Sequence, residues 1–201
     1  MTKYILNSGG VKKFPQKEID FAKEMLFDFK VDDEVKILYC FFAQPREVWE
    51  VKYEKYKERY IQLIDSSFKI NFELAYPEKF EEQIRLSNII FILGGDDHLL
   101  KFWLRQFNLP KIWDGKIVAT TSAGSGALVN SFWTCDWRKS LDGLNILPIK
   151  FIPHYKSETY GLDDPRGPID WEKAYQEISE FGDKNLPIYA LGEGDFIVFN
   201  Q

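Results

Sequence analysis

Residues 116–129, KIVATTSAGSGALV, have the pattern of a strand followed directly by a turn and a helix, and this pattern is the main indication of the fold. Residues 116–121 are mainly apolar or β-branched, which is typical of a strand buried inside a parallel sheet. The small residues that follow, Ala123–Val129, predict a helix that can lie close to this strand. Ser122 stands at the junction, where a sharp strand–turn–helix connection would lift its side chain out of the sheet.

Strand-like and helix-like segments alternate on both sides of this junction. Strands are predicted over Lys3–Asn7, Val35–Ala43, Lys69–Ala75, Ile89–Leu93, Ile149–Pro153, Ile188–Leu191 and Phe196–Asn200, and helices over residues 15–29, 46–65, 77–85, 99–107 and 171–181. This order predicts an α/β fold with a mainly parallel, doubly wound sheet and helices on both faces. Because Gly192-Glu193-Gly194 forms a short turn between the last two strands, we expect a C-terminal hairpin.

The length and composition of the chain argue against several classes of protein. A chain of 201 residues predicts one domain spanning residues 1–201. The net charge of −5, without any basic block, argues against nucleic acid as a partner. Two Cys and two His argue against a disulfide scaffold and a zinc module. The sequence shows no signal peptide and no apolar run long enough for a membrane span, so we expect a cytoplasmic protein without a membrane partner.

Three polar or glycine-rich segments follow predicted strands, namely Gly94-Gly95-Asp96, Thr121-Ser122-Ala123-Gly124 and Pro153-His154-Tyr155. In doubly wound sheets, ligands bind beyond the carboxyl ends of the strands, so these segments are expected to meet. Ser122 would be a nucleophile with His154 as its base, and the N–H of Ala123 would face the developing oxyanion. A serine here can also be a simple helix cap, so only the joint arrangement favours catalysis.

The carboxylate that orients His154 is less well defined by the sequence. Asp136 lies between Ser122 and His154, and Asp142 and Glu158 are alternatives. The order Ser–Asp–His also occurs in α/β-hydrolases, but His154 follows Ser122 too closely for that fold. The polar, turn-rich segment 156–170 is predicted to be a functional loop that closes over the site.

Four motifs in chain order resemble the S51 serine peptidases, the family of aspartyl dipeptidase (peptidase E) and cyanophycinase. They are Ile90–Leu100 (IFILGGDDHLL), Ser122-Ala123-Gly124, Leu141–His154 (LDGLNILPIKFIPH) and Leu191–Val198 (LGEGDFIV). The resemblance extends roughly from Lys3 to Asn200. It implies an α/β sandwich related to class I glutamine amidotransferases.

The resemblance also implies an activity and a set of residues. It suggests a serine exopeptidase that hydrolyses short peptides through an acyl-enzyme, with a possible preference for an acidic N-terminal residue. Its residues would be Ser122 as nucleophile, His154 as base, Asp136 as the third triad member, Gly95 and Ala123 as oxyanion donors, and Gly94, Asp96, Arg166 and Glu193 as substrate-binding residues. No metal or organic cofactor is expected, and the expected partners are a short peptide and, in a homodimer, a second copy of the chain.

Three positions depart from the family pattern. Thr120 replaces the glycine that usually lies two residues before the nucleophile, and the turn at Gly94 reads Gly-Gly-Asp instead of Gly-Gly-Asn. Arg166 is displaced by a few residues from the arginine that pairs with acidic substrates in aspartyl dipeptidases. These departures motivate a second hypothesis, a catalytically weak or inactive amidotransferase-like binding or sensor protein that uses the same cleft. A nucleotide-binding α/β module is the third and weakest hypothesis, because Gly94-Gly95 does not have the pattern of a phosphate-binding loop.

Overall fold

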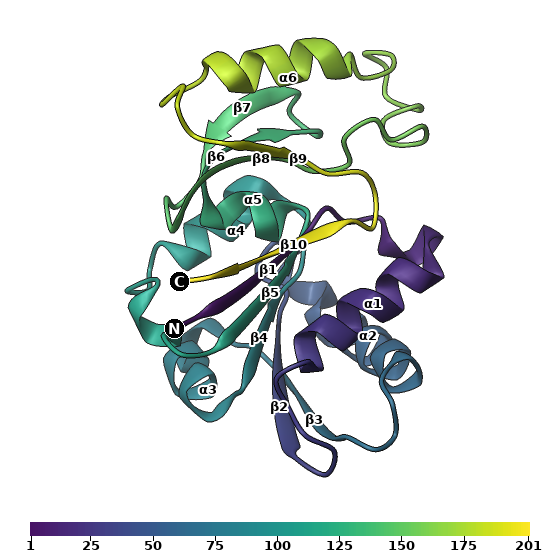
Figure 1. Cartoon of the computed structure of the whole chain (residues 1–201), viewed down its shortest axis with the longest axis vertical. Helices are drawn as coiled ribbons and strands as arrows, with labels where there is room; N and C mark the ends of the chain where they lie inside the picture. Colours follow the sequence, from purple (N-terminus) through teal and green to yellow (C-terminus); the bar gives the residue numbers. More distant parts are fainter.

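The computed structural model describes residues 1–201 and confirms the α/β class, but its strands form two sheets rather than one (Figure 1). The six-stranded sheet has the order β10 (Phe196–Asn200), β1 (Lys3–Asn7), β5 (Ile117–Thr121), β4 (Ile89–Ile92), β2 (Glu34–Cys40) and β3 (Lys69–Leu74). Neighbouring strands are parallel except β10, which runs antiparallel to β1. The parallel strands therefore end at one edge of the sheet, as expected for a doubly wound fold.

The second sheet has four strands, two of which the sequence did not predict. Its order is β7 (Lys139–Asp142), β6 (Val129–Thr134), β8 (Leu147–Ile152) and β9 (Ile188–Ala190). β8 is parallel to β6 and β9, whereas β7 is antiparallel to β6. β6 was missed because it follows the preceding helix directly, without the Gly or Pro that usually marks a boundary.

The last two strands do not form the expected hairpin. β9 pairs with β8 in the small sheet, and β10 pairs with β1 in the large sheet. The yellow segment between them passes from one sheet to the other in Figure 1. A glycine-rich turn permits a hairpin, but here each strand completes a different sheet and hydrogen-bonds to its edge. The connection therefore carries Glu193 into the space between the sheets.

The helices cover both sheets. They are α1 (Pro15–Leu26), α2 (Trp49–Leu63), α3 (Phe80–Leu86), α4 (Asp97–Leu104), α5 (Ala123–Leu128) and α6 (Trp171–Glu180). α1 and α2 pack on one side of the large sheet and α3 on the other, α5 lies between the sheets, and α6 covers the outer face of the small sheet (Figure 1). None of these helices is both long and apolar enough to cross a bilayer.

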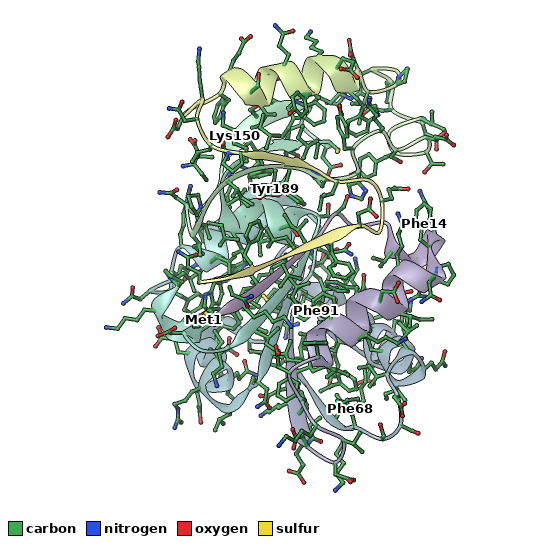
Figure 2. All side chains as sticks on the ribbon, in the orientation of Figure 1. Met1, Phe14, Phe68, Phe91, Lys150 and Tyr189 are labelled. Carbon is green, nitrogen blue, oxygen red and sulfur yellow. The ribbon has the colours of Figure 1, made fainter.

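The apolar core runs through the large sheet and continues into the small one. Phe91 on β4 is fully buried near the centre of the large sheet (Figure 2). Phe132 and Phe151, on the small sheet, belong to the same cluster of buried side chains. A smaller cluster that includes Ile152 and Ile178 lies between the small sheet and α6. This packing fixes the two sheets relative to each other and so fixes the strand ends that meet between them.

Lys150 on β8 is fully buried although it carries a charge (Figure 2). Its ammonium group donates hydrogen bonds to the carbonyl oxygens of Ile178, Ser179 and Phe181 at 2.8, 3.1 and 2.6 Å. These carbonyls lie at the C-terminal end of α6, where the helix dipole also favours a cation. Lys150 therefore attaches α6 to the small sheet.

We expect Lys150→Met to lower the free energy of unfolding by about 2–3 kcal/mol, because three carbonyl groups at the end of α6 would lose this charged hydrogen-bond donor. Urea unfolding followed by circular dichroism measures this change. Lys184→Met, at an exposed position near the same helix end, is the matched control and should be nearly neutral. Equal unfolding midpoints for the two variants would show that Lys150 contributes no more than an exposed lysine.

Candidate active site

Ser122 and His154 meet between the two sheets. Ser122 lies at the turn from β5 to α5 with φ 50° and ψ −114°, a strained conformation for any residue with a side chain. Its Oγ is 3.0 Å from Nε2 of His154. His154 follows β8, and its backbone N–H donates a hydrogen bond to Oγ of Ser8 at 2.6 Å. The structure thus brings together the serine and histidine that the sequence suggested, with the serine on a sharp turn.

Thr120 does not disturb this turn. Its side chain is fully buried, and its hydroxyl lies 2.7 Å from Oγ of Ser125 on α5. Ser125 in turn donates a hydrogen bond to the carbonyl oxygen of Asn7 on β1 at 2.8 Å. The threonine that replaces the family's glycine is therefore accommodated in a polar contact that joins β5, β1 and the start of α5.

Glu193, rather than Asp136, is the carboxylate beside Nδ1 of His154. Oε1 of Glu193 lies 3.4 Å from Nδ1, and both side chains are over nine-tenths buried. Asp136 forms no ion pair with His154; its Oδ1 accepts a hydrogen bond from the hydroxyl of Tyr160 at 2.6 Å. The structure therefore brings Glu193, and not Asp136, to the histidine, because the crossing between β9 and β10 carries it there from the far end of the chain.

Burial lowers the pKa of His154 below its ordinary value. The carboxylates of Glu193 and Asp136 act in the opposite direction, since they favour the protonated ring, but they do not cancel the effect of burial. Lys13, whose ammonium lies 3.3 Å from Glu193, adds to the lowering. The lowered pKa favours the neutral ring, which is the form that can accept a proton from Ser122.

The Ser8-Gly9-Gly10 segment after β1 is a part of the site that sequence reasoning treated only as a turn. A Cβ atom on Gly9 would lie 2.7 Å from Cε1 of His154 and 3.0 Å from Cβ of Ser122. A Cβ atom on Gly10 would lie 2.9 Å from the side chain of Glu193. The signal was present in the sequence, since this glycine pair follows a predicted strand just as Gly94-Gly95 does.

We expect Gly9→Ala to lower kcat/KM at least about 100-fold, because the added methyl group must displace the imidazole from Ser122. Peptide hydrolysis rates measure the effect. Gly115→Ala is the matched control, because Gly115 has a similar positive φ but open space around it. Both variants should lose some stability, but only Gly9→Ala should lose activity. Similar activity in the two variants would contradict the close packing at Gly9.

The candidate oxyanion donors lie next to Ser122. A Cβ atom on Gly94 would be 3.0 Å from Cβ of Ser122 and 3.4 Å from the backbone nitrogen of Ala123. Gly95 has φ 151°, and a side chain there would collide with the carbonyl oxygen of Ala43. Ala123 is the first residue of α5, so its N–H has no partner within the helix. Gly95 and Ala123 both line the pocket that contains Ser122, so their N–H groups are the candidate oxyanion donors.

Asp97 lies in the pocket, whereas its neighbour Asp96 does not. Asp96 caps α4 by accepting a hydrogen bond from the N–H of Leu99 at 2.7 Å. Asp97 is buried, lines the pocket beside Ser122 and accepts a hydrogen bond from Thr134. Burial raises its pKa to about 6. The sequence could not distinguish these two adjacent aspartates because the start of α4 decides which of them turns inward.

The loop 156–170 covers the site. The ring of Tyr160 stacks on His154 with centroids 4.4 Å apart. Arg138 holds the far end of the loop by donating hydrogen bonds to three backbone carbonyls, those of residues 166–168, and it pairs with Asp164 at 3.5 Å. Arg166 pairs with Asp164 and donates to the carbonyl oxygen of Asp136. With the loop in this position, the void beside Ser122 is only about 10 Å³.

Two further features help to define the site. A larger cavity of about 470 Å³ lies between α1 and the end of α2, but it contains none of the residues above, so volume alone does not identify the active site. The chain has no group of three or more His, Cys, Asp or Glu side chains arranged to hold a metal ion. The polar side chains that meet at the strand ends are those of Ser122, His154 and Glu193.

A profile of peptidase family S51 matches residues 5–201. The chain belongs to peptidase family S51. It is thus a serine peptidase, and the motifs that suggested this family from the sequence lie around one site. No curated protein sequence matches the chain.

Two solved structures have folds similar to this S51 peptidase. One is a peptidase from an acI-B1 Actinobacterium, which is 19% identical in sequence and has a TM-score of 0.59. The match covers 99% of this chain and 83% of that chain. The other is a candidate peptidase E protein from Listeria monocytogenes EGD-e, which is 15% identical in sequence and has a TM-score of 0.59. The match covers 100% of this chain and 99% of that chain. At these identities, the similarity shows a shared fold.

Proposed function

We propose that this S51 peptidase is an exopeptidase that hydrolyses short peptides through an acyl-enzyme on Ser122. The observation that carries the proposal is the distance of 3.0 Å between Oγ of Ser122 and Nε2 of His154 at a strained strand–helix turn. A serine that only caps a helix needs no such histidine, and its side chain would accept a hydrogen bond from the helix. Ser122 makes no such capping bond.

The reaction would begin when Oγ of Ser122 attacks the scissile carbonyl carbon and Nε2 of His154 accepts the hydroxyl proton. The carbonyl oxygen would acquire negative charge and accept hydrogen bonds from the N–H groups of Gly95 and Ala123. His154 would then give its proton to the leaving amine as the C–N bond breaks. Water, activated by the same histidine, would cleave the resulting ester and restore Ser122.

Glu193 would orient His154 and stabilise the imidazolium ion formed during attack. The distance of 3.4 Å to Nδ1 is long for a hydrogen bond, and such contacts often shorten in the substrate complex. Lys13 lies 3.3 Å from the carboxylate, and the backbone carbonyl of Glu193 accepts a hydrogen bond from Lys17. These contacts hold Glu193 against the histidine.

Substrate entry requires the loop 156–170 to move. The space beside Ser122 holds little more than a water molecule, and Tyr160 forms part of its wall. A loop of this kind would limit substrates to short peptides by closing around them. An acidic N-terminal residue is not part of the proposal, because Arg166 is paired with Asp164 and does not line the pocket.

A peptide panel and a covalent probe test this proposal together. The panel contains dipeptides and tripeptides with acidic, neutral and basic N-terminal residues, and mass spectrometry detects their products. A fluorophosphonate, which reacts with activated serine hydroxyls, should add its mass to the tryptic peptide that contains Ser122. Release of single N-terminal residues or dipeptides supports an exopeptidase, whereas internal cleavage of long peptides would contradict it.

The closed pocket also favours a second candidate, a binding or sensor protein that uses the same cleft without turnover. Tyr160 stacked on His154 would then be the resting state, and a ligand would displace it. The fluorophosphonate separates the two candidates. A sensor would bind peptides but leave Ser122 unlabelled, whereas a peptidase would be labelled in proportion to its loss of activity.

A further inference from the structure

The pocket beside Ser122 carries two acidic side chains, Asp97 and Asp136, and no basic one. We propose that this pocket receives a cationic group of the acyl residue, either its α-ammonium group or a basic side chain, and disfavours an acidic side chain. The inference rests on the proposed function, since it takes Ser122 as the residue that attacks the substrate. Ser122 defines the place of the site, and the two carboxylates decide which substrate charge fits there.

The pocket lies on the acyl side of the scissile bond. Its wall includes Ser122 and the two candidate oxyanion donors, Gly95 and Ala123, but not His154. The leaving amine has to lie against Nε2 of His154 in order to receive its proton. The part of the substrate that stays bound to Ser122 in the acyl-enzyme is therefore the part that enters this pocket.

Both carboxylates can accept hydrogen bonds from a substrate. Oδ2 of Asp97 accepts a bond from Thr134, and no other side chain of the protein donates to this carboxylate. Oδ1 of Asp136 accepts one from the hydroxyl of Tyr160. An ammonium or guanidinium group is a donor without lone pairs, and it would satisfy the open acceptors while offsetting two negative charges. A substrate carboxylate would meet like charges and no donor from either side chain.

The neighbouring cations are bound elsewhere. Lys101 beside Asp97 donates its hydrogen bond to the carbonyl oxygen of Asp142 at 2.8 Å. Lys13 lies beyond His154, where it contacts Glu193. Neither residue lines the pocket. Their charges therefore leave the wall beside Ser122 acidic.

The two arginines near the mouth of the pocket are also bound. Arg138 donates hydrogen bonds to the backbone carbonyl oxygens of residues 166–168 and forms an ion pair with Asp164. Arg166 is paired with Asp164 at its other end and touches Asp136 only through the backbone carbonyl oxygen. An acidic substrate would have to break the Arg166–Asp164 pair to reach a cation.

Tyr160 occupies the place of the substrate donor in the closed state. Its hydroxyl is 2.6 Å from Oδ1 of Asp136, and its ring covers His154. When the loop opens, the exposed carboxylate of Asp136 loses this partner, and a donor on the entering group can take the place of Tyr160 in competition with water. This exchange links opening of the loop to the charge of the substrate.

The test measures binding to the Ser122→Ala variant and turnover by the wild-type enzyme. The probes are the dipeptides Lys-Leu, Gln-Leu and Glu-Leu, which share the α-ammonium group and differ in side-chain charge, and N-acetyl-Gln-Leu, which lacks that ammonium group. Isothermal titration calorimetry gives Kd for Ser122→Ala. We expect Lys-Leu to bind at least about 10-fold more tightly than Glu-Leu if the side chain enters the pocket. If the α-ammonium group enters, acetylation should weaken binding by at least about 10-fold.

Matched variants connect this selectivity to the pocket. Asp136→Asn and Asp97→Asn, each combined with Ser122→Ala, should reduce the preference for the cationic probe several-fold while circular dichroism stays unchanged. Asp163→Asn, an exposed change of the same charge in the loop 156–170, should leave the preference as it is. Arg166→Gln should not weaken Glu-Leu binding, because Arg166 does not serve an acidic substrate.

Tighter binding of Glu-Leu, equal binding of all four probes, or no binding at all would overturn the inference. So would a loss of Glu-Leu binding in Arg166→Gln, which would assign that arginine to an acidic substrate. Failure of the proposed function looks different. In that case wild-type enzyme hydrolyses no peptide and Ser122 is not labelled by the fluorophosphonate, whereas charge selectivity is still measured by binding.

Discussion

Ser122→Ala should abolish peptide hydrolysis, with a fall in kcat of at least about 1000-fold, while the protein remains folded. The variant removes the only atom that can form the acyl-enzyme beside His154, and the amides of Gly95 and Ala123 can support only weak residual catalysis. The strained backbone at residue 122 is equally strained with alanine, so little change in stability is expected. Product formation by mass spectrometry measures kcat, and thermal unfolding checks the fold.

Ser125→Ala is the matched control for this experiment. Ser125 lies on the same helix, but its hydroxyl is buried against Thr120 and the carbonyl oxygen of Asn7. Its loss should lower stability by about 1–2 kcal/mol without removing the nucleophile. Wild-type rates in Ser122→Ala, or loss of fluorophosphonate labelling in a folded Ser125→Ala, would show that the nucleophile is wrongly assigned.

Glu193→Gln should lower kcat by about 100- to 10,000-fold, because the imidazolium ion formed at His154 would lose its negative partner. The pH–rate profile gives a second measurement, because the charge of Glu193 affects the pKa of His154. Glu193 raises the pKa of His154, so its replacement by a neutral amide lowers that pKa further. The acidic limb of the pH–rate profile should therefore move to lower pH, because the base stays neutral at lower pH than in the wild type.

Asp136→Asn is the comparison that distinguishes the two carboxylates. Asp136 has a weaker influence on the pKa of His154 than Glu193, and it hydrogen-bonds to Tyr160. With Gln-Leu, whose side chain is neutral, Asp136→Asn should keep kcat within about 10-fold of wild type and shift the acidic limb only slightly. If Asp136→Asn shows the large loss and Glu193→Gln does not, Asp136 rather than Glu193 orients the histidine. Because glutamine preserves the shape of Glu193, a purely structural role would not shift the pH profile.

The ends of the strands can be predicted from the sequence, because runs of apolar residues mark where each strand lies. Apolar runs such as residues 35–43 predict buried strands, and β2 (Glu34–Cys40) overlaps most of that run. Because strand ends carry ligand sites in α/β folds, the sequence predicts that Ser122 and His154 meet. The two residues do meet, but they follow β5 and β8 of different sheets, not two strands of one sheet. The family motifs added the nature of the chemistry, and the match to family S51 confirmed it.

The choice of carboxylate could not be made from the sequence, because it depends on a strand pairing between distant segments. Glu193 lies in a short glycine-rich connection, and the same pattern is compatible with a hairpin that would leave it on the surface. Only the separate pairing of β9 with β8 and of β10 with β1 carries it to His154. Asp136 was the nearer residue in the chain, but distance along the chain does not determine distance in space.

The sequence by itself determined the α/β class, the serine and histidine, and the peptidase family, because periodicity and short motifs encode these locally. Tertiary structure alone decided the division into two sheets, the position of Glu193, the contact of Gly9 with the histidine and the inward turn of Asp97. Each of these depends on packing between segments far apart in the chain. Such packing reflects the burial and hydrogen bonding of the whole molecule, which no single stretch of residues specifies.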